Sequence, residues 1–92
     1  MDAELDDQRI PAVAPPFRFQ WEEAQDCYVL LYPEGMVKLS GSAGEIIKRC
    51  DGKKTVSDII SELNIQFPGA DLDNDVKLFF KQAIENGWIR IK

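Results

Sequence analysis

The chain has 92 residues, a formal net charge of −5 at pH 7 and a hydrophobic fraction of 45%. This length accommodates one domain with one core, and no apolar run approaches the ~18 residues of a membrane span. The acidic balance argues against nucleic acid or an anionic membrane as partner, and the acidic N-terminus lacks the features of a secretory signal, so we expect a cytoplasmic protein.

The first sixteen residues are predicted to form a flexible acidic arm. The first ten residues carry four acidic side chains against one basic side chain, and three prolines follow within residues 11–16. This polar, proline-punctuated composition is typical of a flexible segment that ends in a short extended stretch. We therefore divide the chain into an N-terminal arm, residues 1–16, and a folded domain, residues 17–92.

The first strand of a predicted antiparallel sheet begins at Phe17. Phe17, Phe19 and Trp21 alternate with polar residues, and this period of two indicates a strand with one aromatic face. After a turn at residues 22–26, residues 27–32 are apolar on both faces. Such a pattern is typical of a central strand that is covered on two sides.

A tight turn joins this strand to a short third strand. Pro33 fixes φ at about −65°, and Gly35 is expected to supply a residue with φ > 0, which together favour a three-residue hairpin connection with a glycine bulge. Residues 36–39 then form the third strand, at one edge of the sheet. An edge strand exposes unpaired N–H and C=O groups and can accept an added strand. A proline at Leu39 is therefore expected to remove an edge donor.

Two helices are predicted next from their capping residues. Ser42 with Glu45 forms a capping box for the first helix, and Gly52 provides its stop. Thr55 with Asp58 opens the second helix in the same way. The sequence Phe-Pro-Gly at residues 67–69 ends it.

The third helix is predicted between Asp71, its cap, and Asn86. At about 100° per residue its apolar residues form a broad stripe. The centre of the stripe, which we expect in the core, consists of Leu72, Val76, Phe79 and Ala83. Beside it lie Phe80, Ile84 and Lys77, for which both a core position and the rim of a groove remain open.

Three strands followed by three helices predict an α+β fold with a winged helix-turn-helix-like architecture. The alternating segment Trp88–Ile91 adds either a short strand or an extended tail packed on the core. DNA-binding domains of this class insert a helix bearing Arg, Lys, Asn or Gln into the major groove. Residues 71–86 instead carry four acidic side chains, two lysines and no arginine. DNA binding is therefore a minor alternative.

The sequence favours binding over catalysis. It contains no histidine, no nucleophile–base spacing and no phosphate-binding glycine pattern. Cys27 and Cys50 lack metal-ligand spacing. They are able to pair in principle, and we interpret them as buried small apolar residues. Asp71, Asp73 and Asp75 lack the glycine and distal glutamate of a calcium loop, so we expect no enzyme activity, no metal and no cofactor.

An ordered series of short motifs runs from residue 17 to residue 89. It consists of Arg18-x-x-Trp21-Glu22-Glu23, the run Leu30-Leu31-Tyr32-Pro33-Glu34-Gly35, Leu39-Ser40, Cys50-Asp51-Gly52, Phe67-Pro68-Gly69 and Gly87-Trp88. In this order and at these spacings the series resembles the PqqD family, small peptide chaperones of pyrroloquinoline quinone (PQQ) biosynthesis. We interpret most of these residues as parts of turns, caps and the core.

The resemblance implies a protein without catalytic residues that binds a peptide. Members of the PqqD family are recognition elements of pathways that modify ribosomally made peptides. They bind the precursor peptide PqqA and deliver it to PqqE, a radical S-adenosylmethionine (SAM) enzyme that crosslinks a glutamate to a tyrosine of the peptide. The alternative is a leader-peptide recognition module of another modified-peptide pathway. Both a monomer and a homodimer remain open.

The resemblance also implies where the peptide binds. In such recognition elements the leader segment adds as a strand to the third strand and packs against the third helix. Carried to this chain, the strand side of the site consists of Met36, Val37, Lys38 and Leu39. The helix side consists of Val76, Lys77, Phe80, Ala83 and Ile84. This location agrees with the open edge that is expected from the order of the strands.

Overall fold

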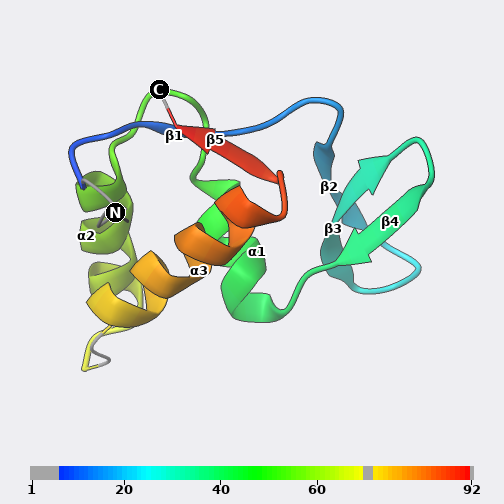
Figure 1. Cartoon of the computed structure of the whole chain (residues 1–92). Coiled ribbons are helices and arrows are strands. Elements are labelled where there is room, and N and C mark those ends of the chain that lie inside the picture. The colour runs from blue at the N-terminus through cyan, green and yellow to red at the C-terminus, as the bar shows by residue number, and fades with distance from the viewer. Residues whose placement is uncertain (1–6, 70–71, 92) are drawn as a thin grey trace.

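The computed structural model describes residues 7–69 and 72–91 (Figure 1). A three-stranded antiparallel sheet of order β2-β3-β4 lies beside three helices, and a separate two-stranded sheet pairs β1 with β5. The predicted α+β fold is confirmed, and its likeness to winged helix-turn-helix domains stays a prediction. In chain order the elements are β1 (Pro11–Val13), β2 (Arg18–Glu22), β3 (Cys27–Tyr32), β4 (Gly35–Lys38), α1 (Gly41–Lys48), α2 (Val56–Gln66), α3 (Asp73–Glu85) and β5 (Ile89–Ile91).

The strand β3 is the centre of the larger sheet. Val29 and Leu30, which point to opposite faces of the sheet, are both fully buried, as expected for a central strand. The turn after β3 differs from the prediction. Tyr32 pairs directly with Gly35, so the hairpin connection has only two residues. Gly35 is a strand residue and is not among the described glycines with positive φ, so the predicted glycine bulge is wrong.

The helix α1 begins two residues earlier than the predicted capping box. Its N-cap is Ser40, whose side chain accepts a hydrogen bond from the Ala43 N–H at 3.2 Å. Ser42 is thus already inside the helix. The helix ends at Lys48, and Gly52 follows in the next turn with φ +80°, where its N–H donates to the Pro11 carbonyl at 3.3 Å. Both predicted signals for α1 were therefore misplaced by two to four residues.

A close approach to the sheet fixes α1 in place. Gly44 is buried, and a Cβ atom at this position would lie 2.9 Å from Cδ2 of Tyr28 on β3. Because that distance is shorter than carbon atoms tolerate, a larger residue here would force Tyr28 or α1 to shift, and glycine allows the close approach. Gly44 thus decides how the helices dock on the sheet.

Replacing Gly44 by alanine is expected to destabilise the protein by about 1–3 kcal/mol, the usual cost of overpacking a core. The matched control is Gly41→Ala in the same helix, since nothing lies within 4 Å of a Cβ atom there. Urea denaturation followed by circular dichroism measures both variants. A Gly44→Ala variant as stable as Gly41→Ala would contradict the docking described above.

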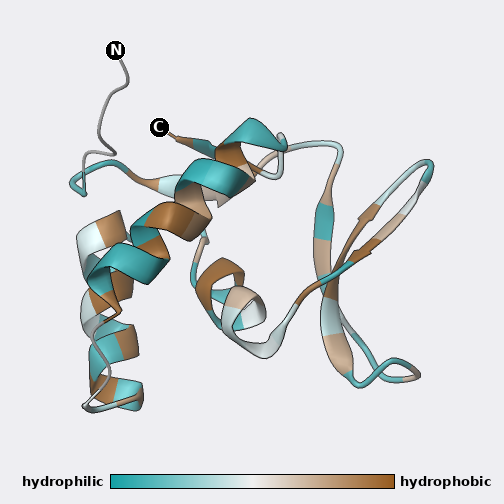
Figure 2. Ribbon diagram, turned by 60° about the horizontal axis from the view of Figure 1, so that its bottom comes forward, coloured by the Kyte–Doolittle hydropathy of each residue, from teal (hydrophilic) through white to brown (hydrophobic). Residues whose placement is uncertain are grey.

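The helix α2 begins as predicted. The Thr55 side chain accepts from the Asp58 N–H, and the Asp58 carboxylate accepts from the Thr55 N–H, at 3.0 and 3.1 Å. Arg49, the C-cap residue of α1, then joins the two helices: its guanidinium pairs with Glu45 at 2.8 Å and with Glu62 of α2 at 3.2 Å. The apolar faces of the helices meet beneath this cluster, and Figure 2 shows hydrophobic bands alternating with hydrophilic ones along α2 and α3.

The buried face of α3 is shifted from the predicted one toward Phe80. Its N-cap is Leu72, without a side-chain cap hydrogen bond, and the predicted cap Asp71 lies outside the described residues. The buried residues are Val76, Phe80 and Ala83. Phe79, which was expected at the centre of the stripe, is only partly buried. The stripe is therefore centred closer to Phe80, and Phe79 lies at its border.

Part of the predicted arm belongs to the fold. Pro11–Val13 pairs antiparallel with Ile89–Ile91, so the alternating C-terminal segment is a strand rather than a tail. Further upstream, the carbonyls of Asp7 and Arg9 accept from N–H groups in the first turn of α2. Figure 1 shows this segment crossing from α2 past β5 to β2. Ordered structure thus begins before residue 17, and residues 1–6 of the predicted arm lie outside the described part. No described helix has the length and apolarity to cross a membrane.

Candidate functional site

The backbone of β4 offers hydrogen-bonding groups at an edge of the sheet. β4 pairs with β3 alone among the strands of its sheet. The Leu39 N–H donates to the Tyr28 carbonyl at 3.0 Å. Bonded and non-bonded pairs alternate in an antiparallel ladder, so Val37 also points its N–H and C=O toward β3. Met36 and Lys38, in the alternate register positions, therefore direct theirs away from the sheet.

This alternation corrects one expectation. Leu39 was predicted to contribute an edge donor, but its N–H is already bonded to β3 and its side chain is 6% exposed in the core. A proline at Leu39 would therefore damage the ladder and the core instead of removing an edge donor. The strand was located correctly from the sequence, whereas the phase of its hydrogen bonds depends on the pairing with β3.

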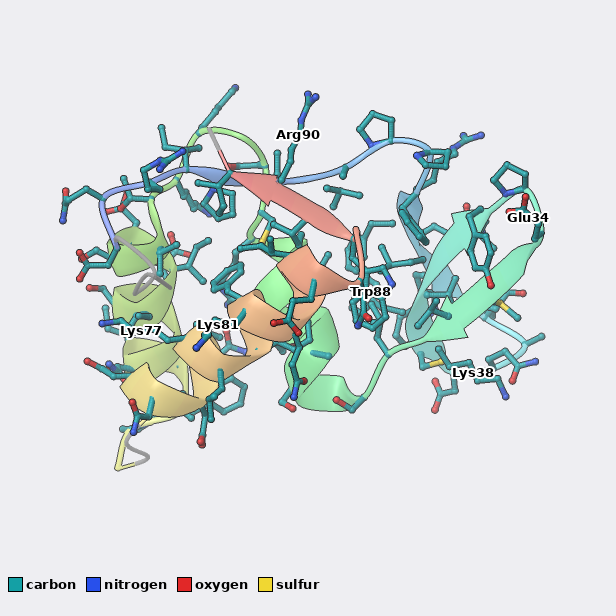
Figure 3. The ribbon with its side chains drawn as sticks, viewed as in Figure 1. Glu34, Lys38, Lys77, Lys81, Trp88 and Arg90 are labelled. Atoms are coloured by element: carbon teal, nitrogen blue, oxygen red, sulfur yellow. The ribbon has the colours of Figure 1, made fainter. Side chains whose placement is uncertain are left out.

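The side chains of β4 alternate between the two faces of the sheet. Val37 is partly buried and packs with Leu39 on the core between sheet and helices. Met36 and Lys38 point to the opposite face, where Met36 is 41% exposed. Lys38 lies at the end of β4, opposite Glu34 in the hairpin turn (Figure 3). β4 therefore offers its outward backbone groups together with one helix-facing apolar side chain, Val37.

The predicted residues of α3 occupy two kinds of position. Val76, Phe80 and Ala83 are at most 2% exposed, so they belong to the core. Lys77 is partly buried and Ile84 is exposed. At about 100° per residue these two lie on one flank of the buried stripe. Figure 3 shows Lys77 and Lys81 on the part of α3 that lies away from Lys38 of β4.

The other flank of α3 lines a pocket that the sequence did not indicate. Its volume is about 680 Å³, and it lies between the beginning of α1, the end of α2 and the first half of α3. Phe79 is the last residue of α3 that lines the pocket. Its ring centroid lies 6.5 Å from that of Trp88. Figure 3 shows Trp88 between the end of α3 and β4. The lining consists of Ser40, Gly41, Ser42, Ala43, Glu45, Ile46, Leu63, Phe67, Leu72, Asp75, Val76 and Phe79.

Phe79 and Trp88 are thus the candidate site residues that sequence reasoning missed. Trp88 was interpreted only as a core aromatic residue, and Phe79 as the centre of the buried stripe. The signal in the sequence was the adjacent pair Phe79–Phe80, because neighbouring helical residues point about 100° apart, so that only one of the two can lie at the centre of a buried stripe. Like Val37 of β4, both residues are partly buried and pack against the core.

The chemistry of the described residues is that of a binding surface. In the part of the chain that the structure describes, no three His, Cys, Asp or Glu side chains are placed to hold a metal ion. Burial raises the pKa of the Cys50 thiol to about 12, with a smaller contribution from the Asp51 carboxylate. The N–H groups of Lys53 and Lys54 hold the pKa of Asp51 below its usual value. Both shifts arise where α1 ends, away from β4.

Cys50 is expected to resist alkylation in the folded protein, because its thiol is buried and, with its pKa raised to about 12, is still protonated at pH 9.0, the ordinary pKa of a thiol. Cys27 is only partly buried, so we expect iodoacetamide to label it first. Mass spectrometry of digested protein, labelled with and without urea, locates the label. Equal labelling of both cysteines without urea would contradict the packing of Cys50.

Comparison with known proteins places the chain in a family. A model of the family described as "Coenzyme PQQ synthesis protein D (PqqD)" matches residues 27–89. The chain belongs to the PqqD family. The resemblance noted from the sequence is thereby confirmed.

Relatives of the PqqD family cover most of the chain. One, named PqqA binding protein, from Acinetobacter baylyi, is 57% identical over 74 residues, covering 79% of this chain and 75% of that protein. A protein of the same name from Stutzerimonas stutzeri is 41% identical over 91 residues, covering 98% and 99%. The fold also matches the solution structure of the PqqD part of Methylobacterium extorquens PqqCD. That structure is described as a stand-alone recognition element for ribosomally synthesised and post-translationally modified peptides. The TM-score is 0.72, the sequence identity is 23%, and the match covers 88% of each chain.

Proposed function

We propose that this protein is a peptide chaperone of PQQ biosynthesis that binds the precursor peptide PqqA by strand addition at β4 and presents it to PqqE. The relatives from Acinetobacter baylyi and Stutzerimonas stutzeri are both named for PqqA binding. The observation that carries the proposal is the outward direction of the backbone groups of Met36 and Lys38. An edge strand with free donors and acceptors is what an extended peptide needs for pairing.

In this proposal the two strand positions and the helix have separate roles. The peptide backbone pairs with Met36 and Lys38, and alternate peptide side chains turn toward Val37, as the pleat of a sheet requires. Phe79 and Trp88 provide the apolar wall on the helix side. Val76, Phe80 and Ala83 support that wall from the core. The predicted contacts Lys77 and Ile84 stay a prediction, and they would require a peptide that crosses over α3.

The function is physical rather than chemical. Ordering a flexible peptide consumes about 2–5 kcal/mol of the interaction free energy. With that cost included, we expect a dissociation constant near 1 μM, about −8 kcal/mol. Binding of this strength holds the peptide in an extended conformation and still allows its release to an enzyme.

Isothermal titration calorimetry with synthetic PqqA of Acinetobacter baylyi tests the binding step. We expect saturable one-to-one binding in the micromolar range, and a peptide of the same composition in scrambled order should bind at least tenfold more weakly. Equal binding of the two peptides, or none by PqqA, would contradict the proposal.

Presentation to PqqE is tested separately. Gel filtration of PqqE, PqqA and this protein should give a complex containing all three, and crosslinking of the peptide by PqqE should depend on the protein. Crosslinking at the same rate without the protein would limit its role to peptide binding.

A further inference from the structure

The pocket beside α1 begins where the proposed peptide strand would end. Lys38 is the last residue of β4, and Ser40 and Gly41, two and three residues further on, already line the pocket. A strand rises about 3.3 Å per residue. A peptide paired with Lys38 that continues in the same direction therefore reaches the pocket within about two or three residues. The peptide is the occupant that this geometry favours.

We infer that this pocket receives a bulky apolar side chain from the flank of the precursor peptide that leaves β4 at its Lys38 end, and that this flank is basic. The inference rests on the proposed function, which it extends from the edge of the sheet to a second contact. It also adds a specificity determinant, because backbone pairing along β4 by itself selects no particular sequence.

The walls of the pocket are suited to an apolar side chain. Ile46, Leu63 and Val76 are buried and form its base. Phe67, Leu72 and Phe79 retain exposed surface and are the lining residues that an occupant would cover. The volume of about 680 Å³ falls in the range of about 300–1,000 Å³ typical of ligand pockets. A leucine, phenylalanine or tryptophan side chain fits in it with neighbouring backbone.

The charges at the pocket favour a basic flank. The charged residues of its lining, Glu45 and Asp75, are both acidic. Glu45 is partly neutralised by Arg49 at 2.8 Å. Asp75 is exposed in the first turn of α3. Lys77 and Lys81 are not part of the lining, and at about 100° per residue they point away from Asp75. The lining therefore carries net negative charge, which attracts Lys and Arg and repels acidic segments.

The test blocks the pocket without altering β4. Ser42 is exposed at the rim of the pocket, so Ser42→Trp places an indole across its opening. Ser61→Trp is the matched control, because Ser61 is exposed on α2 and is not part of the lining. Calorimetry measures the affinity of the wild-type protein and both variants for three peptides. These are full-length PqqA of Acinetobacter baylyi, a PqqA shortened at its N-terminus and a PqqA shortened at its C-terminus. Circular dichroism establishes that each variant is folded.

We expect Ser42→Trp to weaken binding of full-length PqqA about tenfold and Ser61→Trp to leave it unchanged. One shortened peptide should bind the wild-type protein about tenfold more weakly, and should lose nothing further with Ser42→Trp. Unchanged affinity of Ser42→Trp for the full-length peptide would overturn the inference, as would equal weakening of all three peptides, since that result means a blocked edge. Absence of PqqA binding to the wild-type protein would instead overturn the proposed function.

A charge reversal tests the basic flank independently of the shape of the pocket. Asp75→Lys should weaken full-length PqqA several-fold at low salt, and the difference should shrink as salt rises. Glu23→Lys is the control, because Glu23 is exposed in the β2–β3 turn and brings the same change in net charge. Equal effects of the two reversals would show only a dependence on net charge and would overturn the basic flank. If Ser42→Trp does not fold, the shortened peptides still test the second contact, because equal affinity of the wild-type protein for all three peptides would overturn it.

Discussion

Replacing Phe80 by alanine is expected to lower the free energy of unfolding by about 3–5 kcal/mol, the usual cost of removing a buried phenylalanine ring. Phe80 is fully buried and heads the largest fully buried side chains of the described residues. Its removal leaves a cavity where α3 meets the rest of the core. Urea denaturation followed by circular dichroism measures the loss, with Phe80→Leu as a milder variant if Phe80→Ala does not fold.

Two control substitutions on α3 show whether the loss of stability is specific to Phe80. Leu78 is 57% exposed, so Leu78→Ala should change the stability by less than about 0.5 kcal/mol. Phe79→Ala should cost less than Phe80→Ala, because Phe79 keeps part of its surface exposed. If Phe79→Ala lowered the free energy of unfolding more than Phe80→Ala, Phe79 would be at the centre of the buried stripe, as the sequence predicted. That result would contradict the packing of α3.

Replacing Lys38 by proline is expected to weaken PqqA binding by about tenfold to a hundredfold. The substitution removes an outward N–H and leaves its partner on the peptide unsatisfied, which costs about 1–3 kcal/mol. The ladder with β3 should survive, since it uses the backbone groups of Val37 and Leu39 on that side. Calorimetry with PqqA measures the affinity, and circular dichroism verifies the fold.

The comparison that isolates the backbone is Lys38→Ala. Alanine removes the same charged side chain and keeps the N–H, so it should weaken binding less than proline does. Equal affinities of the two variants would mean that the backbone of Lys38 does not pair with the peptide. Met36→Pro should repeat the loss, because Met36 occupies the equivalent position in the ladder.

Local signals in the sequence predicted most of the elements. The alternation of Phe19 and Trp21 with polar residues indicated β2, and the Thr55–Asp58 capping box located the start of α2. The strand β1 was missed because it has three residues, begins with a proline and pairs with β5 at the other end of the chain. No local pattern reports such a pairing. The cap of α1 was misplaced because Ser40 and Ser42 are both suitable capping residues.

The candidate site was predictable in location but not in detail. The order of the strands identified β4 as an edge, and the family resemblance indicated the adjacent helix. Which backbone groups face outward depends on the register with β3, which makes Met36 and Lys38 the edge residues instead of Leu39. The side chains of Phe79 and Phe80 point about 100° apart around the axis of α3, as those of any two successive helical residues do. Periodicity alone could not decide which of the two faces the core.

Strand addition at β4 is tested by the N–H chemical shifts of nitrogen-15-labelled protein during a titration with PqqA. We expect saturable shifts at Met36 and Lys38, at Phe79, and at the Trp88 indole N–H, with β2 little affected. Shifts confined to β2 would place the peptide at the other edge of the sheet. Shifts confined to the flank of Lys77 and Ile84, or no shifts at saturating peptide, would contradict strand addition at β4.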